Sequence, residues 1–302
     1  WNCHEHVASA KRLARPLLRR DGELAPCSWD QAVGFAAGRL REIAAAHGPD
    51  AAQFRASARA GNEENYLAQK FARAVLCTNN VDHCARLCHS STVAGLAASL
   101  GSGAMTNSLA DLEQAACILV IGSNTTECHP LVARRIMRAK ARGARLLVAD
   151  PRRIQLAEQA DLAVRQQPGS DVALLNGMAR AILDNGWQDA DYIAARTEGL
   201  EELQEALAGF TLEEAAAHTG IAAEQILEMA RLYAANAPAA ICYAMGITQH
   251  ANGVDQVRAC CNLALLTGNI GRPGGGINPP RGQNRSEERR VGQECRSRRS
   301  PD

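Results

Sequence analysis

Short runs of apolar residues recur along the chain, and each is followed by a loop of small and polar residues. Residues 117–121, 145–149 and 239–243 are almost wholly apolar, and residues 161–164 form a shorter run of the same kind. Continuous apolar runs of this length are typical of strands in a parallel sheet, which is buried on both faces. We therefore predict four strands here, with a further strand over residues 51–57.

Helical periodicity fills the intervals between these runs. The spacing of apolar positions predicts helices over 28–47, 63–76, 92–100, 130–143, 172–185 and 254–266, and a largely helical segment over 197–235. Ser28 with Gln31 and Thr211 with Glu214 match capping boxes. Ser90 or Ser91 is the expected N-cap of the 92–100 helix, and Ser170 that of the 172–185 helix.

Alternating strands and helices predict an α/β fold with parallel, doubly wound, Rossmann-like sheets covered by helices on both faces, in two domains. We expect a partial α/β domain over 1–80, a Rossmann-like domain over 81–284 and a non-native tail over 285–302. That tail is charged, lacks periodicity and resembles a translated sequencing adaptor. Ligands of such folds gather at the carboxyl ends of the strands.

Composition narrows the classes of function. With 302 residues, 46% hydrophobic content and a formal net charge of +1, the chain can bury a large core and has no general attraction for nucleic acid. It contains no apolar run long enough to span a membrane and no signal peptide. The eleven cysteines are scattered, which favours reduced thiols and a cytoplasmic location. A periplasmic location is the alternative, because the first residue is Trp1 and not Met.

Cys88 and His89 stand side by side just ahead of the predicted 92–100 helix. The positive end of a helix favours a thiolate, and a thiolate is both a soft metal ligand and a nucleophile. Three interpretations compete for this pair. The first is a buried cysteine with a capping histidine, and the second is a zinc site that also uses His83 and Cys84. The third is a single metal-ligating cysteine with a catalytic histidine beside it.

Other candidate ligands are weaker. Cys3-His4-Glu5-His6 is a short grouping that lacks the second half of a metal site. Asp150 follows a predicted strand and could bind a ribose or a guanine edge. Ordinary NAD binding has little support, because no Gly-x-Gly-x-x-Gly fingerprint is present.

The segment around Cys88-His89 closely resembles the active-site segment of molybdenum- or tungsten-dependent formate dehydrogenases. The resemblance runs from about Leu17 to Asn284 and includes Gly61-Asn62-Glu63, Asp150-Pro151-Arg152, Thr197-Glu198-Gly199, Leu266-Thr267-Gly268-Asn269 and Arg281-Gly282-Gln283-Asn284. It implies that Cys88 binds the metal, that His89 handles a proton and that Arg281 orients formate. The positions that it assigns to cofactor binding are Arg59, Asn124, Glu127, Asp150, Arg152, Gly169, Asp171, Met245, Gly246, Gln249 and Gln283.

The same resemblance implies a molybdenum or tungsten ion held by two molybdopterin guanine dinucleotides, with formate and carbon dioxide as the reacting pair. It also implies electron-transfer iron–sulfur or NAD-reducing subunits as partners. The iron–sulfur domain of such enzymes, with its [4Fe-4S] cluster, has no counterpart here, so we interpret the chain as an internal fragment that is inactive alone. The alternatives are a related enzyme acting on nitrate or another oxyanion, and a non-catalytic nucleotide-binding module.

Overall fold

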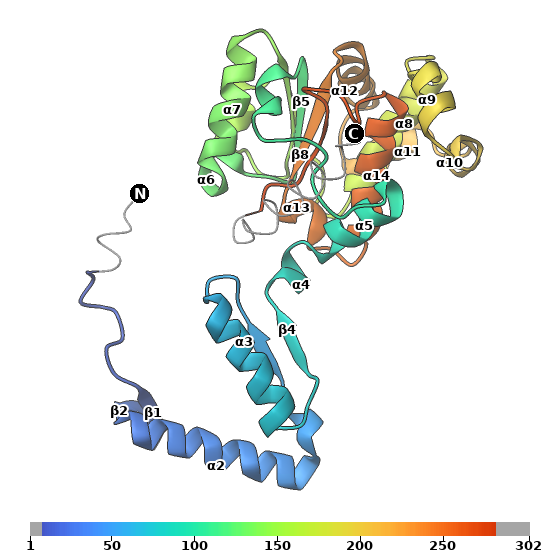
Figure 1. The fold of residues 1–302 in the computed structure, drawn as a ribbon. Coiled ribbons are helices and arrows are strands. Elements are labelled where there is room, and N and C mark those ends of the chain that lie inside the picture. The colour runs from blue at the N-terminus through green and yellow to red at the C-terminus, as the bar shows by residue number, and fades with distance from the viewer. Residues whose placement is uncertain (1–7, 282–302) are drawn as a thin grey trace, which may run out of the picture. The chain divides into compact units, whose positions relative to one another are not determined.

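The structure is a computed structural model, and it describes residues 8–281 (Figure 1). Contacts divide the chain into two units, one that ends at Cys84 and one that begins at Ala85. The candidate cluster at Cys3–His6, Gln283 and the tail from residue 285 lie outside the described residues.

The first unit consists of small elements. The capping box at Ser28 is confirmed, since its hydroxyl accepts from the N–H of Gln31 and the Gln31 side chain accepts from the N–H of Ser28. A two-stranded parallel sheet pairs β3 with β4, and a hairpin of β1 and β2 precedes α2. The elements are β1 Leu17–Arg20, β2 Glu23–Pro26, α2 Trp29–His47, η1 Pro49–Ala51, β3 Phe54–Ala56, α3 Asn62–Lys70, η2 Phe71–Val75 and β4 Val81–His83.

The second unit is built on a parallel sheet of five strands in the order β7-β6-β5-β8-β9. Every residue of the two central strands β5 and β8 is buried, as their continuous apolar sequences predict. The strands are β5 Cys117–Ile121, β6 Arg145–Ala149, β7 Leu162–Val164, β8 Ala239–Tyr243 and β9 Gly276–Asn278.

Helices cover both faces of this sheet (Figure 1). One face packs against α5 Ser90–Leu100, α8 Asp171–Asp184, α12 Ala223–Ala235 and α14 Gly253–Leu266, whose buried apolar residues form the main core with alternate strand residues. The other face packs against α7 Pro130–Ala141 through a second core that includes Ile118 and Ile136. The predicted α/β class with a parallel, doubly wound sheet is confirmed.

Shorter elements complete the second unit and carry most of its loops. They are α4 Ala85–Cys88, η3 Asp111–Gln114, α6 Thr125–Cys128, η4 Gln155–Gln159, α9 Ala190–Arg196, α10 Leu200–Leu207, α11 Leu212–Thr219 and α13 Met245–Thr248. In the part of the chain that the structure describes, no helix combines the length and the apolar character needed to cross a bilayer.

Several predicted details differ from the structure. The helical segment over 197–235 is three helices, because Gly209 and the left-handed Gly220 interrupt it. Helix α5 begins earlier than expected, with His89 and not a serine as its N-cap. Ser170 does occupy the N-cap of α8, but its hydroxyl donates to the Gln167 carbonyl and does not cap the helix.

Candidate functional site

A cleft of about 310 Å³ lies at the carboxyl ends of four neighbouring strands of the larger sheet. Its walls come from the loops that follow β5, β6, β7 and β8, where a parallel sheet presents its ligand site. The predicted cofactor residues that line it are Asn124, Asp150, Arg152, Gly169, Asp171, Met245 and Gly246. Sequence positions spread over more than a hundred residues therefore converge on one cavity.

Two glycines bring the first and last of these loops into backbone contact. Gly122 follows β5 with a left-handed φ of 57°, and its carbonyl accepts from the Gly246 N–H at 3.0 Å. A Cβ on Gly246 would lie 2.6 Å from both the Cα and the carbonyl oxygen of Gly122. No side chain fits between the two loops, so this backbone approach shapes the floor of the cleft.

Polar groups line the cleft in a manner that suits a polar ligand. Asp150 and Asp171 are buried carboxyls; the first accepts from the Arg152 N–H at 2.9 Å and the second from the Gln166 amide at 2.8 Å. Burial raises the pKa of Asp171, although the hydrogen bond from Gln166 opposes that change. Among the described residues, the hydroxyl of Ser123 is buried without a hydrogen-bond partner. Such groups carry a desolvation cost that a bound ligand can remove.

The Cys88-His89 pair lies at the corner between α4 and α5. The loop after β8 holds this corner in place, because the Thr248 hydroxyl donates to the Cys88 carbonyl at 2.6 Å. The Ser91 hydroxyl in turn donates to the Thr248 carbonyl at 3.0 Å. The same loop thus forms one wall of the cleft and anchors the candidate metal ligand.

The His89 ring is buried, with 5% of its surface exposed. Its Nδ1 lies 2.9 Å from the Thr92 hydroxyl, and the Tyr243 hydroxyl donates to the same Thr92 oxygen at 3.1 Å. Burial, together with the nearby charges of Arg281 and His129, lowers the pKa of His89 to about 4, and the backbone of Pro280 opposes part of that change. The ring is therefore neutral at pH 7.

Arg281 and His129 complete the surroundings of His89. The Arg281 guanidinium donates to the Gly103 carbonyl at 3.0 Å, while its Nε is buried without a partner among the described residues. Charges on Arg281 and on His129 both act on His89, which places all three in one neighbourhood. His129 also lines the cleft, and burial lowers its pKa.

The remaining predicted site residues are not in the cleft lining. Glu127 and Gln249 lie on the segments that form the cleft, but both residues are exposed and neither is among those that line it. Arg59 is in the first unit, where its N–H donates to the Ser57 hydroxyl at 3.2 Å. Gln283 lies outside the described residues.

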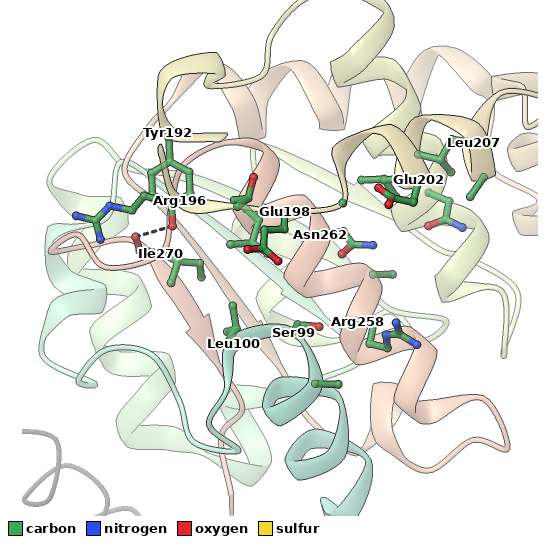
Figure 2. Close-up of a pocket in the computed structure, with 18 of the residues that line it drawn as sticks. Ser99, Leu100, Tyr192, Arg196, Glu198, Glu202, Leu207, Arg258, Asn262 and Ile270 are labelled. Atoms are coloured by element: carbon green, nitrogen blue, oxygen red, sulfur yellow. Dashed lines mark hydrogen bonds between the residues drawn. The ribbon is translucent and has the colours of Figure 1, made fainter. Parts of the chain in front are cut away.

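A second and larger cleft, of about 1300 Å³, lies among α5, α8, α9, α10 and α14 (Figure 2). The Tyr192 hydroxyl closes one end by donating to the Ile270 carbonyl at 3.1 Å. Its charged side chains have both signs, and its described lining includes none of the predicted catalytic or cofactor residues. We place the candidate site in the smaller cleft, because that cleft lies at the strand ends and is lined by His129, whose charge acts on His89.

Comparison with known proteins identifies the family. A sequence model of molybdopterin oxidoreductases matches residues 12–294. The chain belongs to the molybdopterin oxidoreductase family. As a member, it is 50% identical over 282 residues to the F420-dependent formate dehydrogenase 1 subunit alpha of Methanococcus maripaludis, with 93% of this chain and 41% of the relative covered. It is 46% identical over 276 residues to formate dehydrogenase H of Escherichia coli K12, with 90% and 39% covered.

This molybdopterin oxidoreductase chain thus spans about two fifths of the length of these relatives. A solved structure of the same architecture is acetylene hydratase from Pelobacter acetylenicus, with a TM-score of 0.75 and 27% identity. The superposition covers 92% of this chain and 38% of the hydratase. Because a hydratase shares this fold, the fold alone does not determine which reaction the chain supports.

Three residues near the candidate site escaped the sequence analysis: His129, Thr92 and Tyr243. His129 directly precedes Pro130, within the loop already marked after the predicted strand over 117–121, so its position was available as a signal. The sequence carries no such signal for Thr92 and Tyr243. A threonine in a helix and a tyrosine at the end of a strand are common, and only the fold shows that the two side chains are in contact.

Proposed function

We propose that this chain supplies the metal-ligating part of an enzyme that interconverts formate and carbon dioxide. The observation that carries the proposal is the nearness of Arg281 to His89, the residue that follows Cys88, in a chain 46–50% identical to formate dehydrogenase sequences. The reaction removes two electrons from formate and releases carbon dioxide and a proton.

The proposed cofactor is a molybdenum or tungsten ion that Cys88 would hold together with two pyranopterin guanine dinucleotides. In residues 8–281, no three His, Cys, Asp or Glu side chains gather as an ion-binding group. A metal on Cys88 would therefore need most of its ligands from a non-protein group, and soft dithiolenes suit such an ion. When bound, this group supplies the redox chemistry by accepting the electron pair.

The cleft supports one dinucleotide in this proposal. Asp150 is positioned to accept hydrogen bonds from a guanine or ribose, and the partnerless Ser123 hydroxyl and His129 Nδ1 can bind a pterin or phosphate. Asn124, Arg152 and Gly169 would contribute from the neighbouring loops.

Arg281 is proposed to bind the formate carboxylate. A guanidinium donates two parallel hydrogen bonds to a carboxylate, which a lysine ammonium cannot reproduce. The Nε of Arg281 has no partner among the described residues, so a donor remains for a substrate. The neutral His89 beside it carries a proton at one nitrogen and leaves the other as an acceptor.

The electron acceptors are proposed to be iron–sulfur or NAD-reducing subunits of a larger assembly, since one of the relatives is a subunit alpha by name. An enzyme acting on nitrate or another oxyanion is the alternative within this family. A non-catalytic nucleotide-binding module is the alternative outside it.

The test uses the full-length protein that contains this chain. We expect formate to reduce a viologen dye and elemental analysis to find molybdenum or tungsten. Cys88→Ser should remove the soft ligand and abolish turnover, while Cys77→Ser, at an exposed cysteine, should leave turnover unchanged. Arg281→Lys should raise the KM for formate.

Other outcomes would assign the chain elsewhere. Reduction of nitrate without oxidation of formate would favour the oxyanion enzyme. A full-length protein without molybdenum or tungsten would favour the binding module. An Arg281→Lys variant with unchanged KM and kcat would remove the carboxylate-binding role from Arg281.

A further inference from the structure

The segment 103–107 connects α5 with the part of the chain that carries Arg281. Helix α5 ends at Gly101, whose left-handed φ of 76° turns the chain back along the helix. Gly103 then packs against Val93 of α5. The carbonyl oxygen of Gly103 accepts from the Arg281 guanidinium at 3.0 Å. One residue therefore contacts both α5 and the cation that is proposed to bind formate.

The contact between Gly103 and α5 leaves no room for a side chain. A Cβ on Gly103 would lie 2.8 Å from Val93 Cγ1, 3.1 Å from its Cα and 3.2 Å from its carbonyl oxygen. Two of these atoms belong to the helix backbone, and a β-branched side chain in a helix has little freedom to move aside. The Val93 N–H donates to the His89 carbonyl at 3.1 Å. Gly103 is therefore packed against the first turn of α5, which follows the Cys88-His89 corner.

Thr106 fixes the same segment to β9. Its N–H donates to the Ile277 carbonyl at 3.1 Å, and its hydroxyl accepts from the Ile277 N–H at 2.8 Å. A Cβ on Gly276 would collide with that hydroxyl, so the glycine permits the approach. Position 106 thus lies beside 277 and position 103 beside 281, which means that the two segments run antiparallel.

The bond to Gly103 orients the Arg281 guanidinium without occupying all of its donors. An arginine side chain has several rotatable bonds, and a fixed acceptor restricts them before a substrate arrives. A carbonyl carries no net charge, so it holds the guanidinium and does not neutralise it. The Nε of Arg281 is buried without a partner among the described residues, which leaves a donor for a carboxylate.

We propose that Gly103 and Thr106 are positioning residues that set the place of the Arg281 guanidinium relative to the Cys88-His89 corner. Gly103 sets the separation, because its backbone lies against α5 while its carbonyl holds the guanidinium. Thr106 keeps that backbone fixed to β9. The value of this spacing for formate binding rests on the proposed function, whereas the spacing itself rests on contacts within the chain.

A purely structural role for the segment is the alternative, and steady-state kinetics separates the two roles. Loss of folding stability lowers the fraction of active enzyme, so it lowers the apparent kcat and leaves KM unchanged. A displaced Arg281 weakens an interaction made with bound formate, so it raises KM and leaves kcat nearly unchanged.

The first test is Gly103→Ala in the full-length protein that contains this chain. The added Cβ must move the segment away from α5, so the KM for formate should rise about tenfold or more with little change in kcat. Gly209→Ala is the matched control, because nothing lies within 4 Å of a Cβ at that position. It should leave KM unchanged.

Thr106→Val provides a second test that adds no atom to the close contact with α5. It keeps the shape of the side chain but removes the acceptor of the Ile277 N–H, so it should also raise KM. Thr106→Ser retains the hydroxyl and should restore KM. The matched control is Thr219→Val, because the Thr219 hydroxyl likewise accepts a backbone N–H, from Ile221 at 3.2 Å, but belongs to α11. That control should lower stability and leave KM unchanged.

Crystal structures of the full-length protein without formate give a readout besides activity. We expect the wild-type guanidinium of Arg281 to be hydrogen-bonded to the Gly103 carbonyl, and Gly103→Ala to displace it relative to Cys88. A wild-type structure without that bond, or a KM that stays at the wild-type value in both Gly103→Ala and Thr106→Val, would overturn the proposal. If the structures agree but the wild type does not oxidise formate, the proposed function fails and the positioning of Arg281 stands.

Discussion

Acidification should destabilise the native chain through His89. The pKa of this histidine falls from 6.5 to about 4 because the ring is buried near Arg281 and His129. Between these two values the unfolded chain binds a proton that the native chain does not. Stability therefore rises with pH in this window, is complete above pH 6.5 and is lost as the pH falls toward 4.

The magnitude follows from the two pKa values. At pH 7 the unfolded state gains almost nothing from protonation, whereas at pH 5 it gains about 2 kcal/mol relative to the native state. His129, whose pKa is also lowered by burial, adds to the loss with the same sign. A loss of this size is a large fraction of the stability of an ordinary domain.

The assay is urea unfolding of the metal-free chain, followed by circular dichroism at several pH values from 7.5 to 5. His89→Gln cannot be protonated, so its free energy of unfolding should fall less steeply with acid than that of the wild type. His218→Gln, at an exposed histidine of α11, is the matched control and should retain the wild-type slope. Parallel slopes for wild type and His89→Gln would refute the reasoning.

Two further predictions concern packing. Gly246→Ala places a Cβ 2.6 Å from backbone atoms of Gly122, so it should lower the free energy of unfolding by about 1–3 kcal/mol and weaken retention of the cofactor. Gly209→Ala, which has open space around it, should have neither effect. Equal urea midpoints for the two variants would contradict the predicted clash. Leu119→Ala leaves a cavity at a fully buried position of β5 and should lower the free energy of unfolding, measured in urea, by about 2–5 kcal/mol. Leu131→Ala, at a side chain 49% exposed, should lower it far less.

The fold could be predicted where the sequence carries a local signal. Three of the five strands of the larger sheet have the predicted bounds, because a continuous apolar run of five residues between loops is too short for a helix and is typical of a buried strand. Strand β9 was missed, since Gly276–Asn278 is three residues long and follows a glycine-rich loop. Strand β4 was missed because Val81–His83 contains two polar residues and pairs only with the equally short β3.

The candidate site was predictable in part for a similar reason. Asp150 directly follows one predicted strand and Asn124 is three residues beyond the end of another, so the rule that ligands gather at strand ends finds both. Their proximity to Gly246 depends on the strand order, which places β8 beside β5 and is not written in any local pattern. The link between Tyr243 and His89 depends on packing of α5 against the sheet, which only the fold reveals.

The hydrogen bond between Thr248 and Cys88 has a consequence for how the chain is made. The two residues are 160 positions apart, and a ribosome adds about 5–20 residues each second. Cys88 therefore leaves the ribosome about 10–30 s before the segment that anchors its corner has been synthesised. During that interval the hydrogen bond from Thr248 to the Cys88 carbonyl cannot form. The corner between α4 and α5 therefore gains this anchor only after α13 has been synthesised.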